Sequence, residues 1–199
     1  MTDTHDRIAG LLLAAGGGRR LGGRPKALLT HRGRPLVEYA VGVLRAGGCG
    51  PVHVVLGARA GEVRERAELG DCVIVENPDW AEGMGSSLRA GLESLAGTGV
   101  PAVLVSLVDQ PGIGGAAAAR VLGAYRDEGS LVSAAYDGVR GHPVLFGARH
   151  WAGIAAGAVG DQGARGYLKA HEEAITLVEC GDVAEPYDID TEADLVHLE

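Results

Sequence analysis

Four nearly continuous apolar runs, separated by helix-like segments, are the sequence feature that most constrains the fold of this 199-residue chain. Because these runs do not alternate between polar and apolar residues, we expect strands buried on both faces of a parallel sheet. The intervening segments have apolar residues at helical spacing and predict helices. The expected strands are 8–14, 52–56, 73–75 and 102–108, and the expected helices are 36–44, 62–69, 86–95 and 116–125. This alternation predicts an α/β fold with a mostly parallel sheet.

The pattern changes after residue 130. Residues 131–136 and 139–146 are two strand-like runs joined by Asp137-Gly138. The Asp-Gly pair favours a tight hairpin turn, so we expect an antiparallel hairpin near residues 131–146. We further expect a helix over 161–170, a strand over 175–178, and a terminal helix opened by a capping box of Thr191 and Asp194. Ser86 is the expected cap of the helix over 86–95. With neither repeats nor linkers, the sequence predicts one domain over residues 1–199.

Positive charge is concentrated in one short stretch of an acidic chain. The formal net charge is −8, yet Arg19, Arg20, Arg24 and Lys26 lie within eight residues. An acidic chain without an extended basic stripe is not expected to bind DNA or RNA. Concentrated charge of this kind favours a small polyphosphate ligand.

The basic stretch surrounds a glycine-rich loop that directly follows the first apolar run. Backbone N–H groups of such a loop can close around a phosphate. Two familiar versions of the motif fail: the dinucleotide fingerprint requires a third glycine where Leu21 stands, and the chain has no Gly-Lys-Ser or Gly-Lys-Thr. The first failure disfavours a nicotinamide oxidoreductase. The loop with its basic residues therefore predicts a polyphosphate site of another kind.

Acidic residues follow two extended segments and are candidate metal ligands. Asp109 ends the run 102–108, where ligands of open α/β sheets bind, and a carboxylate there can hold Mg²⁺ together with substrate phosphates. A capping Asp in the turn Asp109-Gln110-Pro111-Gly112 is the alternative. Asp188 and Asp190 offer a second carboxylate pair, with solvated acids before a helix cap as the alternative.

The remaining features argue for an ordinary intracellular protein. No apolar run reaches membrane-spanning length, and residues 1–7 lack a signal-peptide pattern. Cys49, Cys72 and Cys180 fit neither a disulfide framework nor a zinc site, so we expect reduced thiols. We expect a cytoplasmic location and no membrane partner.

Several segments together resemble the molybdenum cofactor cytidylyltransferase branch of the nucleotidyltransferases. They are Ala14-Ala15-Gly16 with Arg20-Leu21-Gly22 and Pro25-Lys26, Asn77-Pro78-x-Trp80-Ala81-x-Gly83-Met84-x-x-Ser87, Asp109-Gln110-Pro111, Gly141-His142-Pro143, Gly160-Asp161-x-Gly163-Ala164-Arg165, and Asp188-Ile189-Asp190-Thr191. The chain departs from this pattern at Leu21, at the extra residue of Gly22-Gly23, and at Val108, which stands where glycine is usual before the metal-binding Asp.

The resemblance implies a three-layer, Rossmann-like fold and Mg²⁺-dependent transfer of a nucleotidyl group from an NTP, with release of pyrophosphate. The lead-in Ala14-Ala15-Gly16 resembles cytidylyltransferases and favours CTP. The acceptor implied is a small phosphorylated molecule, molybdopterin or the molybdenum cofactor, and a molybdoenzyme partner follows from it. By the same analogy, Arg20, Lys26 and Asp109 are catalytic and Asp109 and Asp190 hold the metal. The implied nucleotide-binding residues are Leu13, Ala14, Ala15, Gly16, Gly17, Gly18, Lys26 and Ser87, and the implied acceptor-binding residues are His142, Asp161 and Arg165.

No general base is required if the acceptor is a phosphate monoester, because its second pKa is near 6 and it is largely dianionic at pH 7. This agrees with the lack of a convincing His-centred dyad, and it makes His142 a structural or substrate-contact residue. Two other interpretations of the function stay open. One is a guanylyltransferase of the same fold acting on molybdopterin, phosphoenolpyruvate or phospholactate, and the other is a non-catalytic nucleotide-binding cofactor chaperone.

Overall fold

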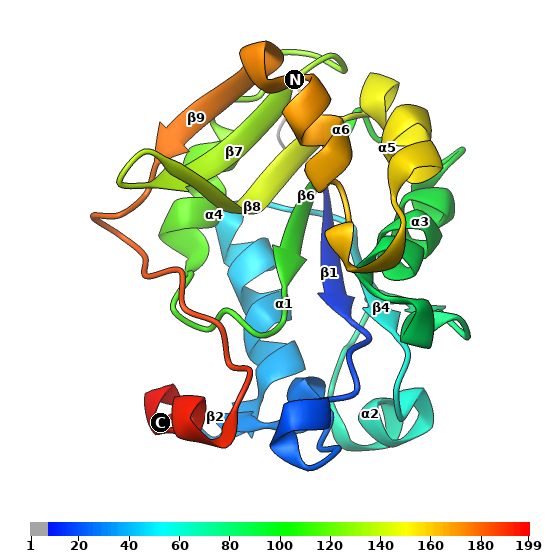
Figure 1. Cartoon of the computed structure of the whole chain (residues 1–199), viewed down its shortest axis with the longest axis vertical. Coiled ribbons are helices and arrows are strands. Elements are labelled where there is room, and N and C mark those ends of the chain that lie inside the picture. Colours follow the sequence, from blue (N-terminus) through cyan, green and yellow to red (C-terminus); the bar gives the residue numbers. More distant parts are fainter. Residues whose placement is uncertain (1–7) are drawn as a thin grey trace.

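The computed structural model describes residues 8–199 (Figure 1). The expectation about residues 1–7 lies outside the described residues. The main sheet has seven strands in the order β5-β4-β1-β6-β8-β7-β9, and β8 is antiparallel to both of its neighbours while all other pairs are parallel. The strands are β1 (Ala9–Ala14), β4 (Val52–Leu56), β5 (Val73–Glu76), β6 (Ala102–Leu107), β7 (Leu131–Tyr136), β8 (Val139–Gly147) and β9 (Ile175–Glu179), with a separate two-stranded sheet of β2 (Thr30–His31) and β3 (Arg34–Pro35).

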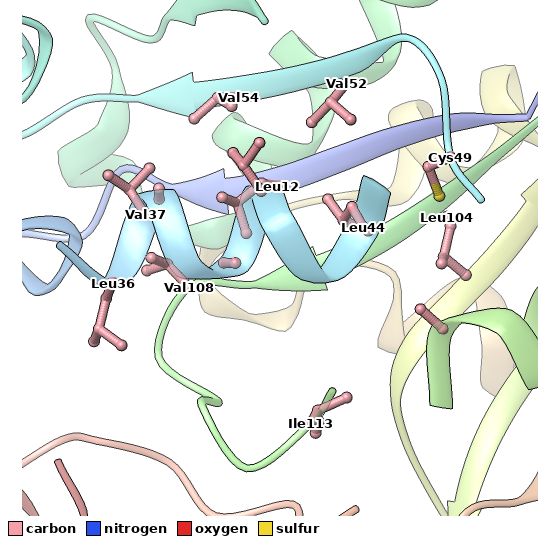
Figure 2. Packing of buried hydrophobic residues seen from close by; sticks show 14 of the residues in the cluster. Leu12, Leu36, Val37, Leu44, Cys49, Val52, Val54, Leu104, Val108 and Ile113 are labelled. Carbon is pink, nitrogen blue, oxygen red and sulfur yellow. The ribbon is translucent and has the colours of Figure 1, made fainter. Parts of the chain in front are cut away.

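Helices cover both faces of the main sheet, as the continuous apolar runs require. Along β1, Leu12 and Ala14 pack on one face, whereas Leu11 and Leu13 pack on the other. Figure 2 shows buried side chains of the first face, among them Val37 and Leu44 of α1, Leu12 of β1 and Leu104 of β6. That face carries α1 (Leu36–Gly47), α2 (Ala60–Arg66) and α4 (Gly115–Leu122), and the other carries α3 (Met84–Leu95), α5 (Trp151–Gly157) and α6 (Arg165–Ala170). The predicted three-layer α/β fold and the antiparallel hairpin are thus confirmed.

The expected elements differ from the structure mainly where glycines intervene. Gly83, not Ser86, is the cap of α3, and the Ser86 hydroxyl instead donates to the backbone carbonyls of Asp79 and Gly83 (2.9 and 2.8 Å). The helix expected over 161–170 is broken, because Gly163 takes a φ of 53° after a short 3₁₀ turn, and only α6 is an α-helix. These corrections affect local backbone and leave the layers unchanged.

The C-terminal segment has the predicted cap and the predicted terminal helix. Thr191 and Asp194 form the capping box, and the residues that follow make a 3₁₀ helix, Glu192–His197. The sequence did not predict α5, because its alanines and glycines lack a strong periodic pattern of apolar residues. Within residues 8–199, no helix combines the length and apolar character needed to cross a membrane.

Candidate active site

Two strand ends bring the glycine loop and Asp109 together. β1 and β6 are adjacent parallel strands, with Leu13 paired to Leu107, and the N–H of Val108 donates to the carbonyl of Leu13 beyond the last pair (3.2 Å). Both strands therefore end at the same edge of the sheet. There β1 leads into the glycine loop and β6 leads into Asp109. This is the carboxyl edge at which open α/β sheets bind ligands.

The glycine loop forms a tight turn that is closed by hydrogen bonds to the backbone carbonyl of Gly18. The carbonyl of Gly18 accepts from the N–H groups of Leu21 (2.9 Å) and Gly23 (3.0 Å). Gly18 has a φ of 61°, and a Cβ there would lie 1.9 Å from the carbonyl oxygen of Arg24. Only glycine fits this position without moving the loop.

A cavity of about 670 Å³, here called the loop cavity, lies beside this turn. It is lined by glycines and basic residues of the loop and by residues at the start of α3. Ala14 is buried and does not line it, whereas the other predicted nucleotide-binding residues do. The lining includes Leu13, Ala15, Gly16, Gly17, Gly18, Arg19, Arg20, Lys26, Trp80, Ser87, Asp109, Asp161 and Asp190.

The ammonium of Lys26 joins the two predicted metal carboxylates. Its Nζ donates to Asp109 Oδ2 (2.7 Å) and to Asp190 Oδ1. The side chain of Lys26 is only 15% exposed, and that of Asp109 is 20% exposed. The N–H of Ile189 donates to the carbonyl of Asp109 (2.9 Å), which fixes the C-terminal segment against the end of β6. Residues more than 160 positions apart in the sequence thus meet at one point.

Electrostatics in this cluster favour a charged lysine. Burial lowers the pKa of Lys26, but the two carboxylates outweigh it and raise the pKa above its ordinary value. Burial also raises the pKa of Asp109, an effect that the Lys26 ammonium opposes. The cluster therefore holds one cation between two carboxylates.

The donor set fits a divalent cation that the substrate helps to hold. Asp109 and Asp190 already converge on one cationic group, so their oxygens are placed to share a positive charge. Across the described part of the chain, no group of three or more His, Cys, Asp or Glu residues could hold a metal. Mg²⁺ commonly takes one or two carboxylates and completes its shell with water and phosphate oxygens. The residues present suit that pattern.

A second cavity, of about 640 Å³, lies between the β7–β8 hairpin and α6 and is here called the hairpin cavity. It shares Asp109 and Asp190 with the loop cavity, so the carboxylates stand where the two spaces meet. Apolar walls and several polar groups line it. They include Leu88, Gln110, Ser133, Tyr136, Arg140, His142, Val144, Phe146, Arg165, Leu168 and Asp188.

The predicted acceptor residues divide between the two cavities. His142 and Arg165 line the hairpin cavity, whereas Asp161 lines the loop cavity. Arg24 lines neither, because its guanidinium pairs with Glu192 (2.6 Å) and ties the glycine loop to the C-terminal segment. In Figure 1 these two segments lie side by side, in dark blue and red. Tyr136 and Arg140 were not predicted as acceptor residues, because only the folded hairpin places them at the cavity, and Gln110, next to Asp109 after β6, was not predicted either.

A buried amide supports the start of α3 beside the loop cavity. Asn77 is 4% exposed, and its Nδ2 donates to the hydroxyls of Ser86 (2.9 Å) and Ser87 (3.0 Å). Ser87 thereby gains a fixed orientation at the cavity wall. The sequence segment around Asn77 pointed to this region without revealing that the amide is the positioning group.

His142 has an electrically neutral ring at physiological pH. Burial lowers the pKa of His142 to about 4, and the nearby positive charge of Arg165 contributes in the same direction. Its backbone carbonyl accepts from the Tyr136 hydroxyl (2.6 Å), which holds this part of β8. A neutral imidazole at the cavity wall can accept or donate one hydrogen bond without adding charge.

This shift predicts a pH-dependent stability. The unfolded chain protonates His142 near pH 6.5, while the folded protein resists protonation down to about pH 4. Stability from this residue is therefore complete above pH 6.5 and is lost as the pH falls towards 4. Between pH 7 and 5, the free energy of unfolding of the wild type should fall about 2 kcal/mol more than that of His142→Gln. Urea unfolding of both proteins at the two pH values measures the difference; equal losses would contradict a neutral His142 in the folded protein.

Comparisons with known proteins identify a family and several relatives of this chain. A family model described as the MobA-like NTP transferase domain matches residues 10–175. A relative named nicotine blue oxidoreductase, from Paenarthrobacter nicotinovorans, is 42% identical over 198 residues, covering 96% of each chain. A molybdenum cofactor guanylyltransferase from Cereibacter sphaeroides is 38% identical over 116 residues, which is 58% of this chain and 56% of that protein.

Two solved structures share the whole fold. The Rv0371c homologue of Mycobacterium sp. strain JC1 is 29% identical, with a TM-score of 0.81 over 96% of this chain and 94% of that one. A manganese complex of Rv0371c from Mycobacterium tuberculosis is 26% identical, with a TM-score of 0.77 over 96% of this chain and 97% of that one. The matched residues 10–175 include the glycine loop, Lys26 and Asp109. The chain belongs to the MobA-like NTP transferase family.

Proposed function

We propose that the protein transfers a nucleotidyl group from an NTP to a small phosphorylated acceptor and releases pyrophosphate. CTP is the favoured donor, and molybdopterin or the molybdenum cofactor is the favoured acceptor. The observation that carries the proposal is the position of Asp109 and Asp190 at the junction of two cavities. One cavity has a phosphate-binding loop with Arg19 and Arg20, and the other has Arg140, Arg165 and apolar walls. Transfer of a group between two substrates needs two adjoining binding spaces with the reacting groups where they meet.

The chemistry asks mainly for positioning and charge neutralisation. An acceptor phosphate oxygen forms a bond to the α-phosphorus, and the bond from that phosphorus to the bridging oxygen of pyrophosphate breaks. Arg20 and Lys26 offset charge on the β- and γ-phosphates, and loop N–H groups orient them. Mg²⁺, held by Asp109 and Asp190, would neutralise phosphate charge at the reacting centre.

Proton transfer to His142 has no part in this scheme. A dianionic phosphate monoester is already a competent nucleophile near pH 7. The lowered pKa of His142, to about 4, makes it a poor base, and its place among the walls of the hairpin cavity suits hydrogen bonding to the acceptor. Arg165 and Arg140 supply charge for the acceptor's phosphate, and the apolar wall residues suit a ring system.

The preference for cytosine rests on the lead-in Ala14-Ala15-Gly16, whereas a relative over part of the chain is a molybdenum cofactor guanylyltransferase. Pyrophosphate release with each NTP, Mg²⁺ and molybdopterin tests both points. We expect CTP to support turnover at least tenfold better than GTP and to raise the melting temperature more. Better turnover with GTP would favour the guanylyltransferase reading, and nucleotide binding without turnover would favour a cofactor chaperone. Co-purification with a molybdoenzyme would test the proposed partner.

A second candidate function is an oxidoreductase, favoured by the relative that matches 96% of this chain. In that case the protein would pass electrons from a reduced donor to a dye such as nicotine blue, with the dye in the apolar hairpin cavity. Leu21, in place of the third glycine of the dinucleotide fingerprint, counts against a nicotinamide nucleotide in the glycine loop. Oxidation of NADH or NADPH, followed by absorbance with and without the dye, tests it. Dye-dependent oxidation without pyrophosphate release from any NTP would replace the transferase proposal.

A further inference from the structure

We infer that Lys26 closes the metal site of the nucleotide-free protein, so that the divalent cation enters together with the NTP. The direct observation is that one ammonium occupies the space between the two carboxylates. Lys26 Nζ is 2.7 Å from Asp109 Oδ2 and also donates to Asp190 Oδ1. These contacts use the carboxylate oxygens that a cation would need. The inference rests on the proposed function only where it concerns the nucleotide.

A free divalent cation gains little by displacing this ammonium. Among the described residues, no group of three or more His, Cys, Asp or Glu side chains is placed to hold a metal ion here, and the neighbouring Asp188 carboxylate accepts from Gln110 Nε2 (2.9 Å). Displacement would leave Lys26, whose side chain is 15% exposed, without its two acceptors. An unpaired charge in a partly buried place is costly. Metal binding without a new partner for Lys26 is therefore disfavoured.

A nucleotide removes that penalty because it brings a new partner for Lys26. The lysine lines the loop cavity, in which Arg19, Arg20 and the backbone of Gly16–Gly18 also face the proposed triphosphate. A triphosphate there presents anionic oxygens to the ammonium and, at the same time, carries a divalent cation towards Asp109 and Asp190. When Lys26 moves from the carboxylates to the phosphates, the divalent cation takes its place, and Lys26, Asp109 and Asp190 all keep a partner of opposite charge.

The backbone turn around Lys26 is held in place, whereas the ammonium at the end of the side chain can move. The N–H of Leu28 donates to the carbonyl of Pro25 (3.0 Å), and that of Leu29 donates to the carbonyl of Lys26 (3.1 Å). Ala27 beside it is 1% exposed and anchors the turn in the core. The lysine side chain has a flexible four-carbon stem, so its ammonium can change partners while the turn stays in place.

The test measures Mn²⁺ binding to nucleotide-free protein by electron paramagnetic resonance. Lys26→Met should bind Mn²⁺ at least tenfold more tightly than the wild type, because the carboxylate pair is then open. Lys26→Arg, which keeps the positive charge, should bind as weakly as the wild type. Lys26→Met combined with Asp109→Asn should lose the gain. Mn²⁺ binding to Lys26→Met that is no tighter than in the wild type would overturn the inference.

Two further measurements keep the test decisive. Lys26→Gln serves if Lys26→Met does not fold, and if neither folds, tight Mn²⁺ binding by the nucleotide-free wild type would overturn the inference while weak binding would support it. In the wild type, CTP with Mn²⁺ should raise the melting temperature where Mn²⁺ alone does not. If no NTP binds or turns over but Lys26→Met still gains Mn²⁺, the proposed function fails and closure by Lys26 stands. If pyrophosphate is released but Lys26→Met binds Mn²⁺ no more tightly than the wild type, the proposed function stands and closure by Lys26 fails.

Discussion

Replacing Asp109 by Asn should slow NTP-dependent pyrophosphate release by about 10³-fold or more while the protein stays folded. Asp109 is the carboxylate nearest to the end of β6, and its Oδ2 lies 2.7 Å from Lys26. The amide removes one negative charge from the place where the cation and the α-phosphate meet. The side-chain volume is unchanged, and Lys26 keeps Asp190 as its partner. The measurement is single-turnover pyrophosphate release, with circular dichroism to check the fold.

Asp188→Asn is the matched control, because Asp188 lines the same hairpin cavity but does not contact Lys26. Its Oδ1 accepts from Gln110 Nε2 (2.9 Å). We expect less than a tenfold loss from this variant, and we expect Asp190→Asn to behave like Asp109→Asn. A larger loss from Asp188→Asn than from Asp190→Asn would move the metal to the other carboxylate. Full activity of Asp109→Asn would remove the carboxylate pair from the mechanism.

The part of the fold that was predictable from sequence is the part governed by local pattern. Apolar runs located β1, β4 and β6 to within a residue or so, because a strand buried on both faces must be apolar throughout. The run 73–75 also located β5, but the expected burial on both faces was wrong there, because β5 is an edge strand and Val73 is exposed. The Asp137-Gly138 turn placed the hairpin, since both residues take positive φ values of 52° and 78°. The parallel order of β1 and β6 then puts the glycine loop beside Asp109, which the rule for open sheets anticipates.

Contacts between distant segments were not predictable in the same way. The pairing of Arg24 with Glu192 removes one of four clustered basic residues from the loop cavity, and no local pattern signals it. The place of Lys26 between Asp109 and Asp190 likewise depends on how the C-terminal segment crosses the sheet edge. Lining residues of the hairpin cavity, such as Arg140, become apparent only when strand register assigns each side chain to a face.

Replacing Gly18 by Ala should destabilise the protein by about 3 kcal/mol or more and abolish NTP binding. The backbone of Gly18 has a φ of 61°, and an added Cβ would lie 1.9 Å from the carbonyl oxygen of Arg24. That oxygen belongs to the backbone, so the loop itself would have to move. The hydrogen bonds from Leu21 and Gly23 to the carbonyl of Gly18 would be strained together, and the loop cavity would lose its shape. Urea unfolding and NTP titration measure the two effects.

Two other loop glycines separate backbone strain from crowding. Gly22 has a φ of 67° but nothing within 4 Å of an added Cβ, so Gly22→Ala should cost only about 1 kcal/mol. Gly16 also has open space around an added Cβ and lines the loop cavity. Gly16→Ala should therefore leave stability within about 0.5 kcal/mol of the wild type while it weakens NTP binding, because the new methyl group enters the space proposed for phosphate. Equal stability losses in Gly18→Ala and Gly22→Ala would show that strain alone governs the loop, and unchanged NTP binding in Gly16→Ala would place the phosphates elsewhere.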